Sequence, residues 1–252
     1  MTAVPWEVDP ACQAPQGAEG GFFVIAGGYR GYAKPRKRHN ADPLQRPVAA
    51  LEKIASDLAY VLQLPVPPVT VFERAEAPAG EARHHAISAV PFENFLSWRK
   101  TLEQPALASR VRVFTPPVMS AMMVFDTWLH ALDRCNNPEN LLVAPGMIED
   151  GEMPGLAFID YAGSMQETWR SWAYSTPYVA PVYDGKTVFD PGIAGAMAAV
   201  IEGFPGEAID AIVGRIPDGF MSETHKRVVV EGLTFRRDHL RGILSAKYAG
   251  VF

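Results

Sequence analysis

The chain has 252 residues, of which 48% are hydrophobic and 20% are charged, a balance typical of a globular protein with a sizeable core. Its net charge of −5 argues against a broad nucleic-acid or anionic-membrane surface, so we expect neither partner. The two cysteines, Cys12 and Cys135, form no CxxC pair, which argues against a zinc site or a disulfide scaffold. No signal peptide and no long apolar span are recognisable, and we therefore expect a soluble, cytoplasmic protein.

The first ninety residues read as β-strands around a single helix. Residues 4–35 are predicted to form strands separated by glycines, with a hairpin turn at 27–31. Apolar residues then recur at helical spacing from Val48 to about Leu64. The best-defined predicted strands are 22–26, 32–35, 69–72 and 85–90. The predicted order of this part is therefore β-β-β-α-β-β.

The remainder of the chain is predicted to be mostly helical. Residues 118–132 are almost continuously apolar, as in a helix buried in a core. Short strands are expected at 140–143 and 156–159, and helices at 193–204, 207–216 and 222–248. We therefore predict an α+β fold with two lobes, a β-rich one at 1–92 and a helical one at 93–252.

Two motifs in the second part carry the strongest functional signal. The motif LDRCNNPENLLV at 132–143 contains Asp133 and Asn140 before an apolar run. The motif AFIDYAG at 157–163 has Asp160 directly after a second apolar run. Phosphoryl transfer from a nucleotide needs one Asp near the attacking hydroxyl, and an Asn and a second Asp that hold magnesium. The spacing predicts that Asp133, Asn140 and Asp160 meet at the rim of one cleft.

The order of these parts resembles the HipA-like kinase group, within the wider protein-kinase and phosphoinositide-kinase superfamily. The resemblance is strongest over residues 20–165, whereas the last ninety residues match only in being helical. It implies a bilobal protein-kinase-like fold with a small β-rich lobe that contains one helix, and with ATP and Mg²⁺ as cofactors.

The resemblance also implies roles for residues of the first lobe. Lys34, on the strand after the glycine turn, would reach the α- and β-phosphates, and Lys37 in the same basic run is an alternative. Glu52, on the following helix, would pair with that lysine, with Asp57 as the competing carboxylate. Without the resemblance, Lys34 would be interpreted as an exposed lysine and Glu52 as a surface glutamate.

Backbone groups complete the expected nucleotide site. Gly17, Gly20 and Gly21 would let N–H groups approach the phosphates, although glycines in hairpin turns are common for structural reasons alone. The connection 88–92, with Val90 at its centre, would offer backbone hydrogen bonds to adenine.

The resemblance assigns Asp133 as the catalytic base and Asp160 as a magnesium ligand. The second magnesium ligand is ambiguous, because in the superfamily the Asn follows the base Asp by five residues, and Pro138 stands there. Asn140 follows by seven residues and adjoins the predicted strand, so we favour it, with Asn137 as the alternative.

The sequence thus predicts an ATP- and Mg²⁺-dependent phosphotransferase that acts on a hydroxyl, with protein Ser/Thr as the first choice of acceptor. The irregular Asp133–Asn140 spacing keeps a nucleotide-binding pseudokinase or scaffold as an alternative. A lipid or small-molecule kinase is a further alternative, and a toxin–antitoxin type partner protein has less support.

Overall fold

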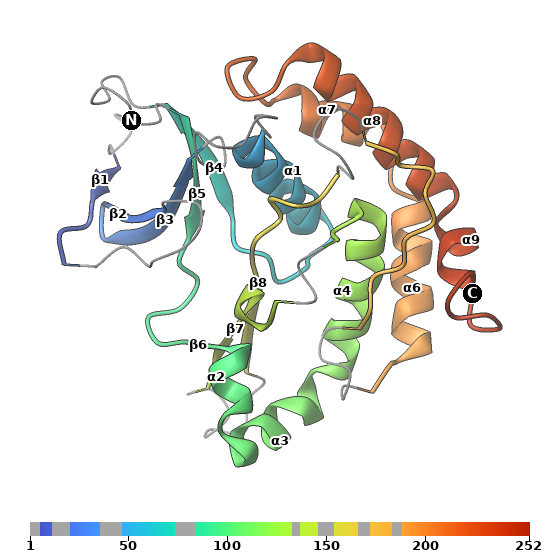
Figure 1. Ribbon diagram of the computed structural model, residues 1–252, viewed down its shortest axis with the longest axis horizontal. Coiled ribbons are helices and arrows are strands. Elements are labelled where there is room, and N and C mark those ends of the chain that lie inside the picture. The colour runs from blue at the N-terminus through green and yellow to red at the C-terminus, as the bar shows by residue number, and fades with distance from the viewer. Residues whose placement is uncertain are drawn as a thin grey trace.

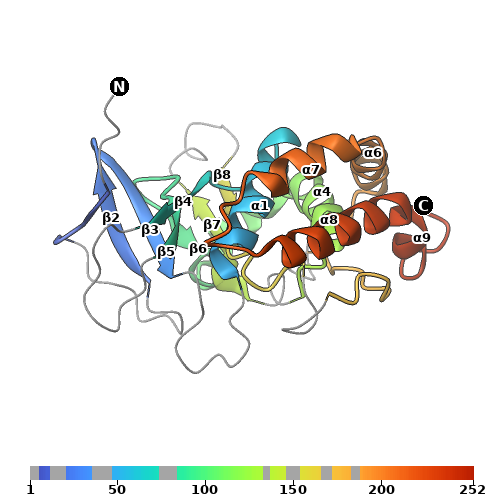
Figure 2. The ribbon, with the colours of Figure 1, turned by 90° about the horizontal axis from the view of Figure 1, so that it is seen from above.

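The computed structural model describes residues 6–11, 21–35, 47–73, 84–132, 137–145, 154–165, 172–182 and 188–252. Strands gather on one side of the molecule and helices on the other (Figure 1), and the view from above shows the same separation (Figure 2). This architecture confirms the predicted α+β fold class.

Five antiparallel strands form the larger sheet. They are β1 (Glu7–Val8), β2 (Phe22–Ala26), β3 (Tyr29–Pro35), β4 (Val69–Glu73) and β5 (His84–Ala89), in the spatial order β1-β2-β3-β5-β4. The turn from β2 to β3 consists of Gly27 and Gly28, whose φ angles of 55° and 85° suit a two-residue hairpin. Because two glycines complete the reversal, β3 begins at Tyr29, three residues earlier than predicted.

Helix α1 (Val48–Val61) lies between this sheet and the helical part of the chain (Figure 1). Its apolar stripe is almost completely buried, with Leu51 at 1% exposure and Ile54 and Leu58 at 0%. The helix contacts β4 and β5 on one side and α7 on the other. The predicted order β-β-β-α-β-β is therefore the observed one, and α1 is the element that joins the two parts.

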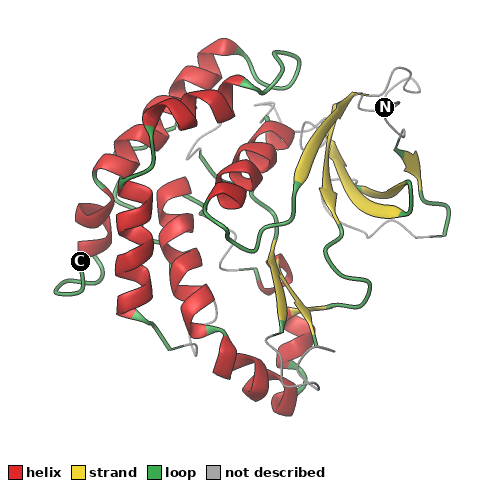
Figure 3. Cartoon of the chain, turned by 180° about the vertical axis from the view of Figure 1, so that it is seen from behind, coloured by secondary structure: helices red, strands yellow, loops and turns green. Residues whose placement is uncertain are grey.

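A second, three-stranded sheet and most of the helices make up the remainder (Figure 3). The strands are β6 (Leu96–Ser97), β7 (Leu141–Ala144) and β8 (Gly155–Phe158), in that spatial order. The helices are α2 (Trp98–Leu102), α3 (Pro105–Phe114), α4 (Pro116–Leu129), α6 (Pro191–Glu202), α7 (Gly206–Gly214), α8 (Glu223–Asp238) and α9 (Leu240–Ser245). None of the helices in the described ranges is long and apolar enough to cross a membrane.

The sequence was least informative about short elements and helix breaks. The predicted helix 222–248 is two helices, because the backbone of His239 leaves helical geometry with φ −114° and ψ 12°. Ser222 is the N-cap of α8, and its Oγ accepts a hydrogen bond from the N–H of His225. Helix α3 gave no clear periodicity, since only Ala108 and Val111 on it are buried.

A buried arginine on α8 holds the helical part together. Arg236 is 0% exposed, and its guanidinium donates to backbone carbonyls at 2.6–3.1 Å. The acceptors are Thr127, Trp128, Tyr174, Thr176 and Tyr178. One side chain thus satisfies the carbonyls at the end of α4 and several carbonyls of segment 172–182, which have no helix or strand partner.

We expect Arg236→Lys to lower the free energy of unfolding by about 3 kcal/mol, because an ammonium cannot reach five carbonyls and leaves several buried acceptors unpaired. Chemical denaturation measures this change. Arg241→Lys is the matched control, since Arg241 is half exposed and pairs with Glu202, and it should cost about 0.5 kcal/mol or less. Equal losses in both variants would contradict the role assigned to Arg236.

Candidate active site

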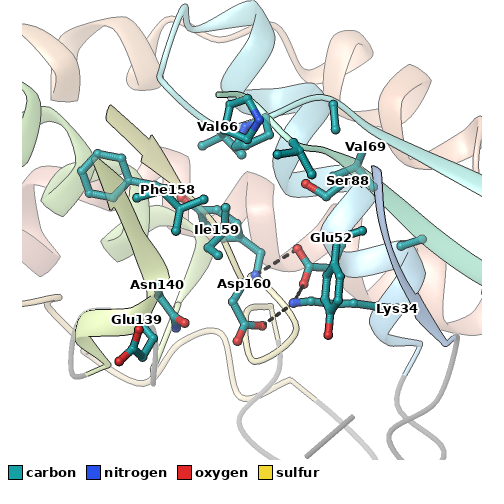
Figure 4. A pocket seen from close by; sticks show the side chains of 18 of the residues that line it. Lys34, Glu52, Val66, Val69, Ser88, Glu139, Asn140, Phe158, Ile159 and Asp160 are labelled. Atoms are coloured by element: carbon teal, nitrogen blue, oxygen red, sulfur yellow. Dashed lines mark hydrogen bonds and ion pairs between the residues drawn. The ribbon is translucent and has the colours of Figure 1, made fainter. Parts of the chain in front are cut away.

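Three charged side chains from distant parts of the chain meet beside α1 (Figure 4). The Nζ of Lys34 lies 2.6 Å from Oε1 of Glu52 and 2.9 Å from Oδ1 of Asp160. Lys34 comes from β3, Glu52 from α1, and Asp160 from the segment that follows β8. The structure therefore brings together the lysine, the helix glutamate and the second acidic residue that the sequence singled out.

The pleat of β3 aims Lys34 at this site. Successive side chains of a strand point to opposite faces of the sheet. Ala33 packs into the small outer core with Val24 and Ile87, so its neighbour Lys34 faces α1. The alternative Lys37 lies outside the described residues.

Glu52 connects the lysine to the segment that carries Asp160. Glu52 is only 5% exposed, and its Oε2 accepts a hydrogen bond of 3.1 Å from the backbone N–H of Tyr161. Burial raises the pKa of the Glu52 carboxyl, while the adjacent Lys34 ammonium opposes that rise. The competing carboxylate of Asp57 lies elsewhere, 2.6 Å from Lys53 on the same helix.

The hairpin formed by β7 and β8 places Asn140 beside Asp160. Leu141 pairs with Phe158, and the N–H of Ile159 donates to the Asn140 carbonyl at 3.0 Å. Asn140 is 5% exposed, and Figure 4 shows its side chain on the side of the Asp160 carboxylate. The φ of Asp160 is +68°, a left-handed conformation that Asp tolerates better than most residues. The two sides of the hairpin thus present an amide and a carboxylate to the same place.

Asn137 has a local structural role that Asn140 lacks. Its Oδ1 accepts a hydrogen bond of 3.1 Å from the N–H of Glu139, which caps the 3-10 turn η2 (Pro138–Asn140). A short 3-10 turn begun by a proline accommodates the residues between the two asparagines. Both asparagines line the same cavity, and Asn140 is the one whose backbone carbonyl binds the N–H of Ile159, next to Asp160.

A cavity of about 430 Å³ opens above these groups, a size typical of small-molecule and cofactor sites. Its polar end contains Lys34, Glu52, Asn140 and Asp160. The rest of the lining is mostly apolar and comes from β4, β5, β7 and the segments around them. Examples are Val66, Val69, Ala86, Leu142 and Phe158. This is the division expected of a site for a ligand with a flat apolar part and a charged tail.

The four residues expected to contribute backbone groups, Gly17, Gly20, Gly21 and Val90, have different outcomes. Val90 lines the cavity, but its N–H already donates to the Arg30 carbonyl at 3.0 Å. Gly21 precedes β2, and a Cβ at this position would collide with the hydroxyl of Tyr32. Its lack of a side chain therefore has a packing reason. Gly17 and Gly20 lie outside the described residues, and so does Asp133.

Sequence reasoning missed two residues of the site. Tyr161 is 1% exposed, and its backbone ties the Asp160 segment to Glu52. Glu139 lines the cavity, and its Oε1 lies 2.6 Å from Nε of Arg99. A backbone donor such as that of Tyr161 leaves no trace in residue type, whereas the position of Glu139 two residues from the strand start was a usable signal.

A buried histidine lies at the C-terminal end of α4. His130 is 0% exposed, accepts a 2.9 Å hydrogen bond at Nδ1 from Nε1 of Trp172, and stacks on Tyr178 with ring centroids 5.1 Å apart. Burial, with a smaller contribution from the charge of Arg236, lowers the pKa of its imidazole to about 4. A neutral histidine in the core has a packing role and no contact with the cavity.

Within the described ranges, no cluster of three or more His, Cys, Asp or Glu side chains is placed to hold a metal ion. The pair Asn140 and Asp160 offers an amide oxygen and a carboxylate, both hard ligands. Mg²⁺ is usually bound in proteins by one or two such groups together with phosphates and water. The donor set at the polar end therefore fits magnesium that arrives with a nucleotide.

Comparison with known proteins supports the fold. No protein-family model matches the sequence, and no curated protein matches it. The structure is similar to that of the Helicobacter pylori proinflammatory kinase CtkA, with a TM-score of 0.63 and 14% sequence identity, over 96% of this chain and 97% of that one. At this identity the similarity shows a shared kinase-like fold, and membership of the HipA-like group stays a prediction.

The buried imidazole of His130 makes the free energy of unfolding depend on pH. An unfolded histidine titrates near 6.5 and the folded His130 near 4, so the unfolded chain binds more protons between these values. The free energy of unfolding should therefore fall as the pH drops from 6.5 to 4, and this contribution is fully present above 6.5.

Denaturation at several pH values, with wild type and His130→Asn compared, checks this expectation. Asn tolerates the left-handed φ of 54° at this position and does not titrate, so the slope between pH 6.5 and 4 should become flatter. His225→Asn, which removes an exposed imidazole, is the control. Identical slopes in wild type and His130→Asn would contradict the assignment.

Proposed function

We propose that the protein is an ATP- and Mg²⁺-dependent phosphotransferase that moves the γ-phosphate of the nucleotide to a hydroxyl acceptor. The observation that carries this proposal is the contact of Lys34 with both Glu52 and Asp160 at the polar end of a nucleotide-sized cavity. A lysine held between two carboxylates has a fixed position, and the kinase-like fold also supports the proposal.

The roles of the residues follow from their contacts. Lys34 would bind the α- and β-phosphates as a point charge, since its ammonium lies at the end of the cavity that also holds Asp160. Glu52 would hold Lys34 in place and, through the Tyr161 N–H, fix the backbone next to Asp160. Glu52 is in this account a positioning residue, because its carboxylate is occupied by these two donors.

Asp160 and Asn140 would hold magnesium together with the phosphates of the nucleotide. Magnesium bound there would neutralise charge on the phosphates and lower the barrier to transfer. The contribution of this chain is a carboxylate and an amide set on opposite sides of one hairpin, a spacing that the β7–β8 register fixes.

The chemical step needs one base. The acceptor oxygen would form a bond to the γ-phosphorus as the bond to the β–γ bridging oxygen breaks, and ADP would leave with that oxygen. The proton of the acceptor hydroxyl would pass to the carboxylate of Asp133, the base assigned by the sequence motif.

A protein serine or threonine is the proposed acceptor, by analogy with the HipA-like group that the motifs resemble. A net charge of −5 argues modestly against a membrane lipid, and the basic run at 34–38 is too short to change that balance. A small-molecule hydroxyl is the remaining alternative within the same chemistry.

A nucleotide-binding pseudokinase is the second candidate, favoured by the seven-residue spacing from Asp133 to Asn140. Against it, the 3-10 turn ends at Asn140 and the hairpin places this residue beside the Asp160 segment. This position of Asn140 supports its proposed role despite the longer spacing.

Asp160→Asn tests the proposal. Asn fits the left-handed backbone and the same volume but removes the charge, so Mg²⁺-dependent phosphate transfer or ATP hydrolysis should fall about 10³-fold while the fold is retained. Asp57→Asn is the matched control, because Asp57 pairs with Lys53 away from the cavity. Its rate should match that of wild type.

The outcomes separate the candidates. A rate unchanged by Asp160→Asn would contradict the proposed function. Wild-type protein that binds Mg·ATP in a thermal-shift titration but transfers phosphate to neither protein, small-molecule nor water acceptors would support the pseudokinase instead.

A further inference from the structure

The turn that joins α7 to α8, residues 215–222, packs against the five-stranded sheet (Figure 1). The ring of Phe220 meets the imidazole of His84 edge to face, with centroids 4.9 Å apart and ring planes at 84°. The backbone of Gly219 lies against the same imidazole, because a Cβ at this position would be 3.2 Å from Nε2 of His84. Since His84 begins β5, the turn contacts a strand that pairs directly with β3.

This contact is made on the face of the sheet that carries Lys34. Side chains two residues apart on a strand share a face, so His84 and Ala86 lie on the same side of β5. Ala86 is the direct partner of Lys34 in the β3–β5 ladder, and directly opposed residues also share a face. Phe220 therefore supports β5 two residues along the strand from the partner of Lys34.

The same region of the chain holds α1. Helix α7 contacts α1, and a guanidinium nitrogen of Arg215 lies 3.9 Å from Oδ2 of Asp57. Phe220, only 3% exposed, belongs to the apolar core that contains the buried stripe of α1. Pro47 at the N-cap of α1 makes no capping hydrogen bond, and no acidic residue stands in the first turn. The position of α1, and of Glu52 on it, is therefore set by tertiary packing.

The turn itself has a well-defined conformation. The N–H groups of Phe220 and Met221 both donate to the Pro217 carbonyl, at 2.8 and 3.2 Å. The side chain of Lys226 on α8 is 8% exposed, and its Nζ lies 2.8 Å from Oδ1 of Asp218. These bonds tie the turn to itself and to α8, so its aromatic side chain presents a fixed surface to the sheet.

We propose that Phe220 is a positioning residue for phosphoryl transfer, which holds α1 and β5 in the arrangement in which Glu52 fixes Lys34. This inference rests on the proposed function. The 2.6 Å contact between Nζ of Lys34 and Oε1 of Glu52 joins the two elements that the turn supports. Phe220 does not line the cavity, so it acts only through that contact. Small displacements of positioning groups lower the rate of a reaction strongly, and the transfer rate therefore depends on this distant ring.

Steady-state kinetics of the full chain test the inference with Phe220→Leu, which keeps an apolar side chain in the core and removes the ring. We expect kcat for Mg²⁺-dependent phosphate transfer or ATP hydrolysis to fall about tenfold. In the Glu52→Gln background, where the contact with Lys34 is already weakened, the same substitution should change kcat by less than about threefold. Phe189→Leu is the control, because Phe189 stacks on Tyr248 in the helical part, and it should leave kcat unchanged.

A second variant leaves Phe220 in place and disturbs the contact from the other side. Gly219→Ala would put a Cβ 3.2 Å from Nε2 of His84 and push the turn away from the sheet. Its kcat should fall at least about threefold, and this loss should disappear in the Glu52→Gln background. Gly214→Ala is the matched control, since a Cβ there meets open space, and its kcat should equal that of wild type.

The outcomes separate this inference from the function on which it rests. Equal losses of kcat in the wild-type and Glu52→Gln backgrounds would indicate a general structural effect and overturn the inference. Full activity in Phe220→Leu and Gly219→Ala would also overturn it, and both results would leave the phosphotransferase standing. Wild-type protein without Mg²⁺-dependent turnover would contradict the proposed function, and the inference with it.

Discussion

The carboxylate of Glu52 is the constraint on which the candidate site depends. It is buried on α1, and burial alone would favour its neutral form. Two donors compensate for the lost water, the ammonium of Lys34 from β3 and the N–H of Tyr161 after β8. The Glu52 side chain thus fixes the position of β3 relative to the segment that contains Asp160. Lys34 and Asp160, which this contact brings together, are 126 residues apart in the sequence.

The rest of the molecule supports this contact from both sides. Helix α1 presses its apolar stripe on β4 and β5 and touches α7, so Glu52 has little freedom to move away. On the other side, Arg236 ties the end of α4 to segment 172–182, and Tyr161 packs against Phe125 of α4. The contact between Lys34, Glu52 and Asp160 is therefore supported by the apolar packing of α1 and by the backbone hydrogen bonds that Arg236 makes in the helical part.

The sequence predicted the parts of the site that depend on residue type and strand order. Lys34, Glu52 and Asp160 meet because a hairpin, a helix and a second hairpin follow one another in the predicted order. The sequence could not predict that the backbone N–H of Tyr161 would donate to Glu52, or that the N–H of Val90 would donate to the Arg30 carbonyl of β3. Backbone contacts depend on tertiary position, whereas α2 and α3 were too short or too weakly apolar to give a pattern.

A crystal structure of the full chain with a non-hydrolysable ATP analogue and Mn²⁺ tests the central claim most directly. The account predicts phosphates on Lys34 and the metal about 2.2 Å from oxygens of Asp160 and Asn140, with Asn137 still bound to the N–H of Glu139. A metal bound to Asn137 in place of Asn140, or a nucleotide outside the cavity that Lys34 and Asp160 line, would contradict it.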